Sequence, residues 1–329
     1  MSDSKAITLS SGNAYWKKFL KTIGGGTLAL TLAPNLLLAE NFKFLDQNSD
    51  YKLTILHTND QHSRIEPFDS SYSRNPNQGG FARRAALIQK IREEEKNVLL
   101  LDSGDTFQGT PYFNFFGGEL EFKLMSMMGY DASTMGNHDF DNGLEGFKKV
   151  LPNAKFPFIC SHYDFKNTIL DGQTRPYKVF KKNGIKVGIF GVGIELAGLV
   201  GKKSYGETVW QNPIEIAQHY ATFLRNEKKC DLVICLSHIG YDYKDNPRKI
   251  SDKILASQTD GIDLILGGHT HTFLPEPQTF VNKSGKNVMV NQVGWAGLLL
   301  GKINFYFDKN KKVKNISWNN QVIDDSILI

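Results

Sequence analysis

Short groups of histidine, aspartate and asparagine follow apolar, strand-like runs at five places spread over more than two hundred residues of this chain. This arrangement constrains the fold more than any other feature, because open α/β sheets carry their ligands at the ends of strands. The segments are HTNDQH (57–62), DSGDTFQG (102–109), MGNHDFD (135–141), LSHIGY (236–241) and GGHTHT (267–272). We therefore expect side chains that are far apart in the sequence to meet at one site.

Strand candidates alternate with helical windows along most of the chain. Strands are expected at 52–57, 97–101, 131–135, 157–160, 185–192, 231–236 and 262–266, and helices near 80–96, 119–129, 142–150, 213–229 and 249–258. After residue 271 the pattern becomes strand-rich, with candidates at 278–282, 287–292 and 297–308 and turns at 284–287 and 308–310. This order predicts an α/β fold whose last strands form antiparallel hairpins.

The segments supply oxygen and imidazole donors but no thiol, which argues against a structural zinc site. The donors are Asp60, His62, Asp105, Asn137, His138, His238, His269 and His271. Mixed nitrogen and oxygen sites suit Zn, Mn or Fe better than Ca or Mg. Two such ions about 3.5–4 Å apart can clamp a phosphoryl oxygen, activate a water and stabilise both the attacking and the leaving oxygen. These residue types therefore predict a two-metal site that hydrolyses a phosphate ester.

Each motif taken alone also has a purely structural interpretation. Asp102 and Asp105 suit turns and helix N-caps, and Asn137 suits a left-handed turn. His269 and His271 are more specific, because side chains at i and i+2 of an extended segment project to the same side. The occurrence of all the motifs together, each after an apolar run, favours the metal site.

These motifs resemble those of the metallophosphoesterase domain of the 5′-nucleotidase family, within the calcineurin-like phosphoesterases. The resemblance covers about residues 50–310 and rests on Asp-x-His, Gly-Asp, Gly-Asn-His-Asp, a single His and Gly-His-x-His, in that order. It implies a four-layer sandwich, in which two facing mixed β-sheets are flanked by helices.

The resemblance also implies which residues hold each ion. The first ion would be bound by Asp60, His62, Asp105 and His271, and the second by Asp105, Asn137, His238 and His269. His138 would face the transferred phosphoryl group, stabilising charge or protonating the leaving oxygen, with Asp141 orienting its ring. Of the other acidic residues nearby, Asp139 is expected to shape the loop and Glu145 to lie on a solvated helix face.

The predicted activity is metal-dependent hydrolysis of phosphate monoesters, with 5′-nucleotides as the favoured substrates. A cyclic-nucleotide phosphodiesterase, a nucleotide-sugar hydrolase or a sulfur-ester hydrolase on the same scaffold is the alternative, and a metal-stabilised binding subunit is the non-enzyme alternative. Relatives usually continue into a domain that stacks the nucleobase, so we expect either a loosely selected substrate or a separate chain that carries this specificity domain. The loop aromatics Phe68, Tyr72, Tyr205 and Trp210 could line a base pocket or serve as packing residues.

Composition is that of a globular enzyme with one main domain, since 40% of the residues are hydrophobic and 22% are charged. The formal charge of +5 favours anionic phosphate substrates but is too diffuse to predict nucleic-acid binding. The three cysteines, Cys160, Cys230 and Cys235, lie in or beside apolar runs and are expected to be buried, unreactive thiols.

The amino terminus resembles an export signal. Lys17, Lys18 and Lys21 precede the apolar stretch 22–40, although Trp16 and Lys17 stand where a twin-arginine signal has its arginine pair. Gly24 to Gly26 and Pro34 interrupt this stretch, so no stable membrane span is expected. We divide the chain into a signal-like segment, 1–45, and a catalytic domain, 46–329, and expect an exported, periplasmic protein, or a cytoplasmic one if the signal is not used.

Overall fold

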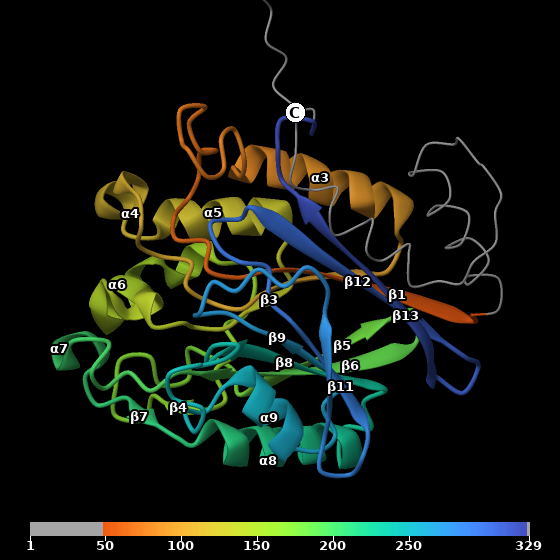
Figure 1. Cartoon of the computed structure of the whole chain (residues 1–329). Helices are drawn as coiled ribbons and strands as arrows, with labels where there is room; N and C mark the ends of the chain where they lie inside the picture. Colours follow the sequence, from red (N-terminus) through yellow and green to blue (C-terminus); the bar gives the residue numbers. More distant parts are fainter. Residues whose placement is uncertain (1–48, 328–329) are drawn as a thin grey trace, which may run out of the picture. The chain divides into compact units, whose positions relative to one another are not determined.

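The computed structural model describes residues 49–327, and two β-sheets form the centre of this part of the chain (Figure 1). The first sheet has the order β13 (Val313–Val322), β12 (Leu299–Phe307), β1 (Tyr51–Thr58), β2 (Val98–Asp102) and β3 (Ala132–Ser133). The second has the order β10 (Gln278–Val281), β11 (Asn287–Asn291), β9 (Leu264–Leu266), β8 (Leu232–His238), β6 (Ile185–Gly193) and β5 (Tyr177–Lys182). Two short strands, β4 (Tyr163–Asp164) and β7 (Val209–Trp210), pair with each other.

The two sheets face each other across an apolar core. Ile55 of β1 and Leu99 of β2 belong to the same buried cluster as Ile189 of β6 and Ile234 of β8. The neighbouring Leu56 belongs to a different cluster, on the opposite face of the first sheet, because successive strand residues point to opposite faces. Burial on both faces explains why the central strands are almost continuously apolar in sequence.

Helices cover the outer face of each sheet (Figure 1). The helices described are α3 (Phe81–Glu94), α4 (Pro111–Phe116), α5 (Glu119–Met128), α6 (Gly143–Val150), α7 (Lys202–Tyr205), α8 (Pro213–Asn226) and α9 (Asp252–Gln258), with 3₁₀ turns at His138–Phe140 and Leu151–Asn153. The short helices α4 and α7 lie beside the sheets, at the left in Figure 1. Helices α3, α5 and α6 share an apolar cluster with β1 and β2, and α8 and α9 share another with β6, β8 and β9. The layers are therefore helix, sheet, sheet and helix, which confirms the predicted four-layer α/β sandwich.

Parallel pairing brings the polar segments together. Strands β1, β2 and β3 run parallel to one another in the first sheet, and β6, β8, β9 and β11 do so in the second. The carboxyl ends of parallel strands lie at one edge of a sheet, where ligands bind in open α/β folds. The segments that follow β1, β2, β3 and β9, and the last residue of β8, therefore meet at one edge of the sandwich.

The strand predicted at 157–160 was wrong. This segment makes only isolated parallel bridges, between Phe158 and Ser133 and between Ile159 and Arg175. It crosses from the first sheet to the second, since Ile159 donates to the carbonyl of Ser133 and two residues later Ser161 donates to that of Gly191. A segment that changes sheets within three residues cannot build a ladder with either one.

Three other differences concern element bounds and pairing. The helix predicted from residue 249 begins at Asp252, because the side chain of Ser251 caps it by accepting from the backbone N–H of Ile254. Strands β10 and β11 form the predicted antiparallel hairpin. Strand β12 also forms an antiparallel hairpin, with β13 across the predicted turn at 308–310, but this hairpin lies in the other sheet, beside β1. Neither β5 nor β13 was among the strand candidates.

The predicted cysteine environment is confirmed, since Cys160, Cys230 and Cys235 are all buried and unpaired in disulfides. Burial raises the pKa of the Cys160 thiol to about 12, which keeps it unreactive. None of the helices described between residues 49 and 327 is long and apolar enough to cross a membrane. The signal-like segment 1–45 lies outside the described residues and stays a prediction.

Candidate metal centre

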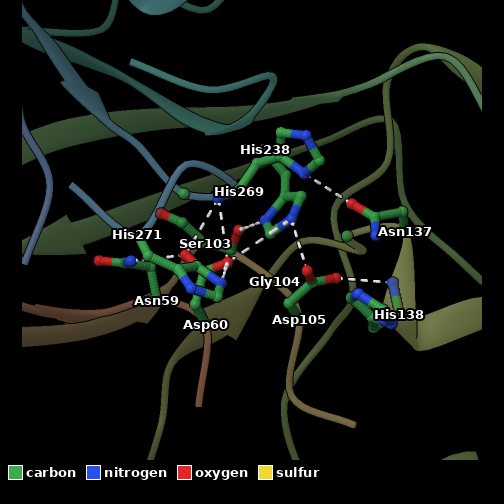
Figure 2. Close-up of polar contacts among 12 residues, drawn as sticks. Asn59, Asp60, Ser103, Gly104, Asp105, Asn137, His138, His238, His269 and His271 are labelled. Atoms are coloured by element: carbon green, nitrogen blue, oxygen red, sulfur yellow. Dashed lines mark hydrogen bonds and ion pairs between the residues drawn. The ribbon is translucent and has the colours of Figure 1, made fainter. Parts of the chain in front are cut away.

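The predicted site residues lie at the carboxyl ends of parallel strands and come together. Figure 2 shows most of them gathered in one place. Asp60 and His62 follow β1, Asp105 follows β2, Asn137 and His138 follow β3, His238 ends β8, and His269 and His271 follow β9. The first three strands belong to one sheet and the last two to the other. The site therefore forms only when the two sheets pack together, because each sheet supplies part of the ligands.

The backbone turns sharply at most of these ligands. Positive φ values occur at Asp60 (49°), His62 (48°), Asp105 (55°), His269 (73°) and His271 (49°). A left-handed backbone is uncommon for residues other than glycine and costs of the order of 1–3 kcal/mol each. Five such residues at one site indicate a backbone strained to aim side chains into a shared space.

The first ligand group consists of Asp60, His62 and His271. The Nε2 atoms of the two histidines lie 2.9 Å apart, and Nε2 of His271 lies 3.3 Å from Oδ1 of Asp60. Burial lowers the pKa of His62, which keeps its imidazole neutral and able to bind a cation. This group can therefore hold a divalent ion.

The second ligand group consists of Asp105, His238 and His269, with Asn137 beside it. Nε2 of His238 lies 3.0 Å from Oδ2 of Asp105, and Nδ1 of His269 lies 2.7 Å from Oδ1 of Asn137. Burial lowers the pKa of His269 to about 4, so this ring too is neutral at physiological pH. A second divalent ion fits here.

Asp105 lies between the two groups. Its Oδ2 is 3.0 Å from Nε2 of His238 and 4.0 Å from Nε2 of His62, whereas its Oδ1 accepts a hydrogen bond of 2.7 Å from the backbone N–H of His138. Backbone anchoring of one oxygen leaves the other directed at both ligand groups. This geometry is the one expected of a bridging carboxylate.

The residues present fit divalent cations. Nε2 of His238 is fully buried, and although it lies 3.0 Å from Oδ2 of Asp105, the two atoms do not have hydrogen-bond geometry, which is rare for a buried polar atom. Burial opposes protonation of this ring, yet the carboxylates of Asp105 and Asp60 raise the pKa of His238 to about 10. The site therefore attracts positive charge strongly, and nitrogen and oxygen donors are those that Zn, Mn and Fe accept.

Two buried aspartates brace the loops behind the ligands. The carboxylate of Asp102 accepts hydrogen bonds from the side chains of Thr58, Gln61 and Ser133, so it ties together the ends of β1, β2 and β3. Asp139 accepts from the backbone N–H groups of Gly136, Asp105 and Thr106, which confirms its predicted role in shaping the loop. Glu145 is exposed on α6, as predicted.

His138 lies beside the ligand groups and belongs to neither of them. Its Nδ1 lies 2.8 Å from Oδ2 of Asp141, and its ring centroid lies 5.3 Å from that of His62. The hydrogen bond with Asp141 raises the pKa of His138. The pairing occupies Nδ1 and leaves Nε2 as the ring nitrogen that can reach a substrate.

Two residues that support the ligands were not predicted from the sequence. Asn59 donates from Nδ2 to Oδ2 of the adjacent Asp60 and to the carbonyl of Gly294, 235 residues away. The ring of Trp295 stacks on that of His271. The sequence could have pointed to Asn59, because this residue is adjacent to Asp60. It gave no signal for Trp295, which lies in a strand-rich region that contains none of the motifs.

The loop aromatics named as candidates for a base pocket do not gather at one place. Phe68 is 4% exposed and packs against Tyr72 and Trp295, close to the first ligand group. Trp210 donates from its indole N–H to the carbonyl of Gly193. Tyr205 packs against the cluster beneath α5 and α6. The burial of Phe68 and the contacts of Trp210 and Tyr205 are those of packing residues.

A four-layer sandwich with aspartate, asparagine and histidine ligands at its strand ends defines the class of metallophosphoesterases. The sequence model of the calcineurin-like phosphoesterases matches residues 53–273, and the chain belongs to this family. The resemblance inferred from the motifs is thereby confirmed.

The relatives include several 5′-nucleotidases. A snake venom 5′-nucleotidase from Crotalus adamanteus is 35% identical over 298 residues, which cover 84% of this chain and 49% of the venom protein. The crystal structure of a 5′-nucleotidase precursor from Thermus thermophilus has a TM-score of 0.74 and 30% identity, covering 84% of this chain and 55% of that one. The NAD nucleotidase of Haemophilus influenzae has a TM-score of 0.72 and 28% identity, covering 83% and 50%. The chain spans about half the length of these relatives.

Proposed function

We propose that this chain hydrolyses phosphate monoesters at a centre of two divalent metal ions, and that 5′-nucleotides are its substrates. The position of Asp105 carries the proposal, because its Oδ2 lies within 4.0 Å of an imidazole nitrogen in each ligand group. One carboxylate that reaches both groups brings two ions close enough to act on a single phosphoryl group. The relatives named 5′-nucleotidase support the choice of substrate.

The proposed ligand sets follow the two groups. Asp60, His62, Asp105 and His271 would hold the first ion, and Asp105, Asn137, His238 and His269 the second. When bound, the ions supply Lewis acidity to the phosphoryl oxygens and make a water molecule more acidic. Zn, Mn and Fe all suit these donors, and their cellular availability decides among them.

The chain's own part in the reaction is proton transfer and positioning. As a water oxygen bonds to phosphorus and gives up a proton to solvent, the bond from phosphorus to the ester oxygen breaks, and His138 in its protonated form donates a proton from Nε2 to that oxygen. Asp141 holds Nδ1 of the same ring at 2.8 Å, which orients the imidazole and favours its protonated form. The neutral ring then regains a proton from solvent, which it can reach because its side chain is 37% exposed.

The hydrogen bond between Asp105 and the backbone of His138 couples the proton donor to the metal centre. Because Oδ1 of Asp105 accepts the N–H of His138 at 2.7 Å, the donor and the bridging carboxylate keep a constant separation. A reaction that depends on a leaving oxygen lying near both groups benefits from such fixed geometry.

A substrate panel tests the proposal. Protein reloaded with Zn²⁺ or Mn²⁺ is assayed with nucleoside 5′-monophosphates, cyclic nucleotides, nucleotide sugars, thiosulfate esters and an aryl phosphate. We expect the highest kcat/KM with the 5′-monophosphates and none after chelation. Preference for cyclic nucleotides, nucleotide sugars or sulfur esters would favour the alternative hydrolases. Tight metal binding without turnover of any ester would favour a binding subunit.

Export and a separate specificity chain remain predictions from the sequence. We propose that residues 1–45 direct export to the periplasm, on the strength of the lysines and the apolar stretch near the amino terminus. Fractionation of cells expressing the full chain, followed by sequencing of its amino terminus, tests this: cytoplasmic protein that retains Met1 contradicts the proposal.

A further inference from the structure

His271 differs from His62 and His238 in how its ring is held. The side chain of His271 is 40% exposed, whereas those of His62 and His238 are 8% and 0% exposed. Nδ1 of His62 lies 3.2 Å from the carbonyl of Phe107, and Nδ1 of His238 lies 2.7 Å from that of Ser103. Hydrogen bonds of this kind normally orient metal-binding histidines.

Nδ1 of His271 has no such partner within residues 49–327, because the polar contacts of its ring there, with Nε2 of His62 and with Oδ1 of Asp60, both involve Nε2. Instead, its imidazole lies against the indole of Trp295. The ring centroids are 5.6 Å apart and the planes differ by only 6°. A parallel, offset pair of aromatic rings restricts the tilt of both planes. Trp295 therefore supplies the orientation that a hydrogen bond on Nδ1 supplies at His62 and His238.

The backbone around Trp295 is tied to Asp60, a ligand candidate of the same group, and to the adjacent Asn59. Val293 donates its N–H to Oδ1 of Asn59, and Ala296 donates its N–H to the carbonyl of Asp60 at 2.7 Å. Gly294 has a φ of 76°, and a Cβ there would lie 2.1 Å from the ring of Phe273. The segment 293–297 thus has little freedom to move away from Asp60.

The indole is also held from the side. Phe68, which is 4% exposed, meets Trp295 edge to face, with ring centroids 5.8 Å apart and planes at 70°. Backbone hydrogen bonds join Phe68 to Gln78 and Asn77, so this ring is itself well anchored. Trp295 is thereby held between a packed aromatic residue and a metal ligand candidate.

We infer that Trp295 is a positioning residue, which orients the imidazole of His271 and so sets the affinity of the Asp60, His62 and His271 group for its ion. The inference rests on the proposed metal centre. It predicts an effect on one of the two ions, because the stacked ring belongs to one ligand group only.

The test measures metal affinity rather than turnover. Full-length wild type, Trp295→Ala and Trp295→Phe are stripped with a chelator and titrated with Zn²⁺ against a chromophoric chelator, and bound ions per chain are counted. We expect wild type to bind two ions tightly. Trp295→Ala should keep one of them and bind the other about tenfold or more weakly, the effect typical of losing a group that orients a ligand. Trp295→Phe should recover most of the affinity, since it keeps a stacking ring.

Two controls separate positioning from a general loss of stability. Trp318→Ala removes a 39% exposed tryptophan on β13 and should leave both affinities unchanged. In a His271→Ala background, Trp295→Ala should cause no further loss of affinity, because the ring that it orients is gone. Wild-type binding of both ions by Trp295→Ala, equal weakening of both, or full additivity with His271→Ala would overturn the inference. A wild-type chain that binds fewer than two ions would instead refute the proposed metal centre.

Discussion

The Nε2 atoms of His62 and His271 lie 2.9 Å apart, although 209 residues separate them in the chain. His62 follows a strand of the first sheet and His271 a strand of the second. Their contact therefore depends on the packing of one sheet against the other. A cation bound between them links the two halves of the sandwich, so metal binding and the folding of the domain should be coupled.

Asp105→Asn should lose metal and activity together. The carboxylate has an Oδ2 that faces both His62 and His238 while its Oδ1 is anchored, and an amide offers a weaker, neutral ligand. Metal analysis after dialysis should find fewer than two ions per chain, with turnover reduced in parallel. Asp171→Asn, at an exposed position, is the matched control. Two tightly held ions and normal turnover in Asp105→Asn would exclude a bridging role.

His138→Ala should separate metal binding from catalysis. The ring contributes to neither ligand group, and its loss removes a proton donor held by Asp141. We expect two ions per chain and a fall in kcat of roughly 10²–10⁴, the range for losing a positioned acid. The loss should be smaller for an aryl phosphate, whose leaving oxygen needs less protonation. If the variant lost an ion and regained its rate on metal addition, His138 would be a ligand.

Gly136→Ala should block the second ion. A Cβ at this position would lie 2.2 Å from Oδ1 of Asp105 and 2.6 Å from Nε2 of His238, so the methyl group displaces both. We expect loss of the ion held by His238 and a fall in turnover of at least a hundredfold. Gly201→Ala adds a methyl group where nothing lies within 4 Å and is the matched control. Metal titration and assay of the two variants check the prediction, which is wrong if they behave alike.

Stability should fall on mild acidification because two histidines are buried as neutral rings. Burial lowers the pKa of His57 to about 3 and that of His162 to about 3. In the unfolded chain both rings take up protons near the ordinary histidine pKa of about 6.5, whereas in the folded chain they stay neutral. The stabilisation of the folded state by these neutral rings is therefore complete above about pH 6.5 and is lost as the pH falls from about 6.5 towards 3.

At pH 5.5 each ring should lower the free energy of unfolding by about 1.3 kcal/mol relative to neutral pH. Urea unfolding of wild type and His57→Gln between pH 7.5 and 5 should show a shallower pH dependence in the variant. His219→Gln, at an exposed position on α8, should keep the wild-type slope. Parallel pH profiles for wild type and His57→Gln would contradict this explanation.

Local patterns were enough to predict most of the elements near the site. The apolar run of β8 and the ligand candidate His238 at its end are adjacent in sequence. Any fold that buries this run as a strand therefore places His238 at the end of the strand. The same holds for β1 followed by Asp60 and His62. The strand prediction for 157–160 was wrong because this apolar segment crosses from one sheet to the other. Which strand such a segment pairs with depends on residues far away in the sequence.

The sequence by itself determined the fold class, the donor types and the family, because strand periodicity and the ligand motifs are properties of neighbouring residues. Only the tertiary structure decided which donors share a group, where Asp105 points and that Trp295 lies on His271. These relationships join residues far apart in the chain, and they depend on how two sheets pack and how strained turns aim their side chains. Distances of a few ångströms between such residues follow from packing, which no short stretch of sequence specifies.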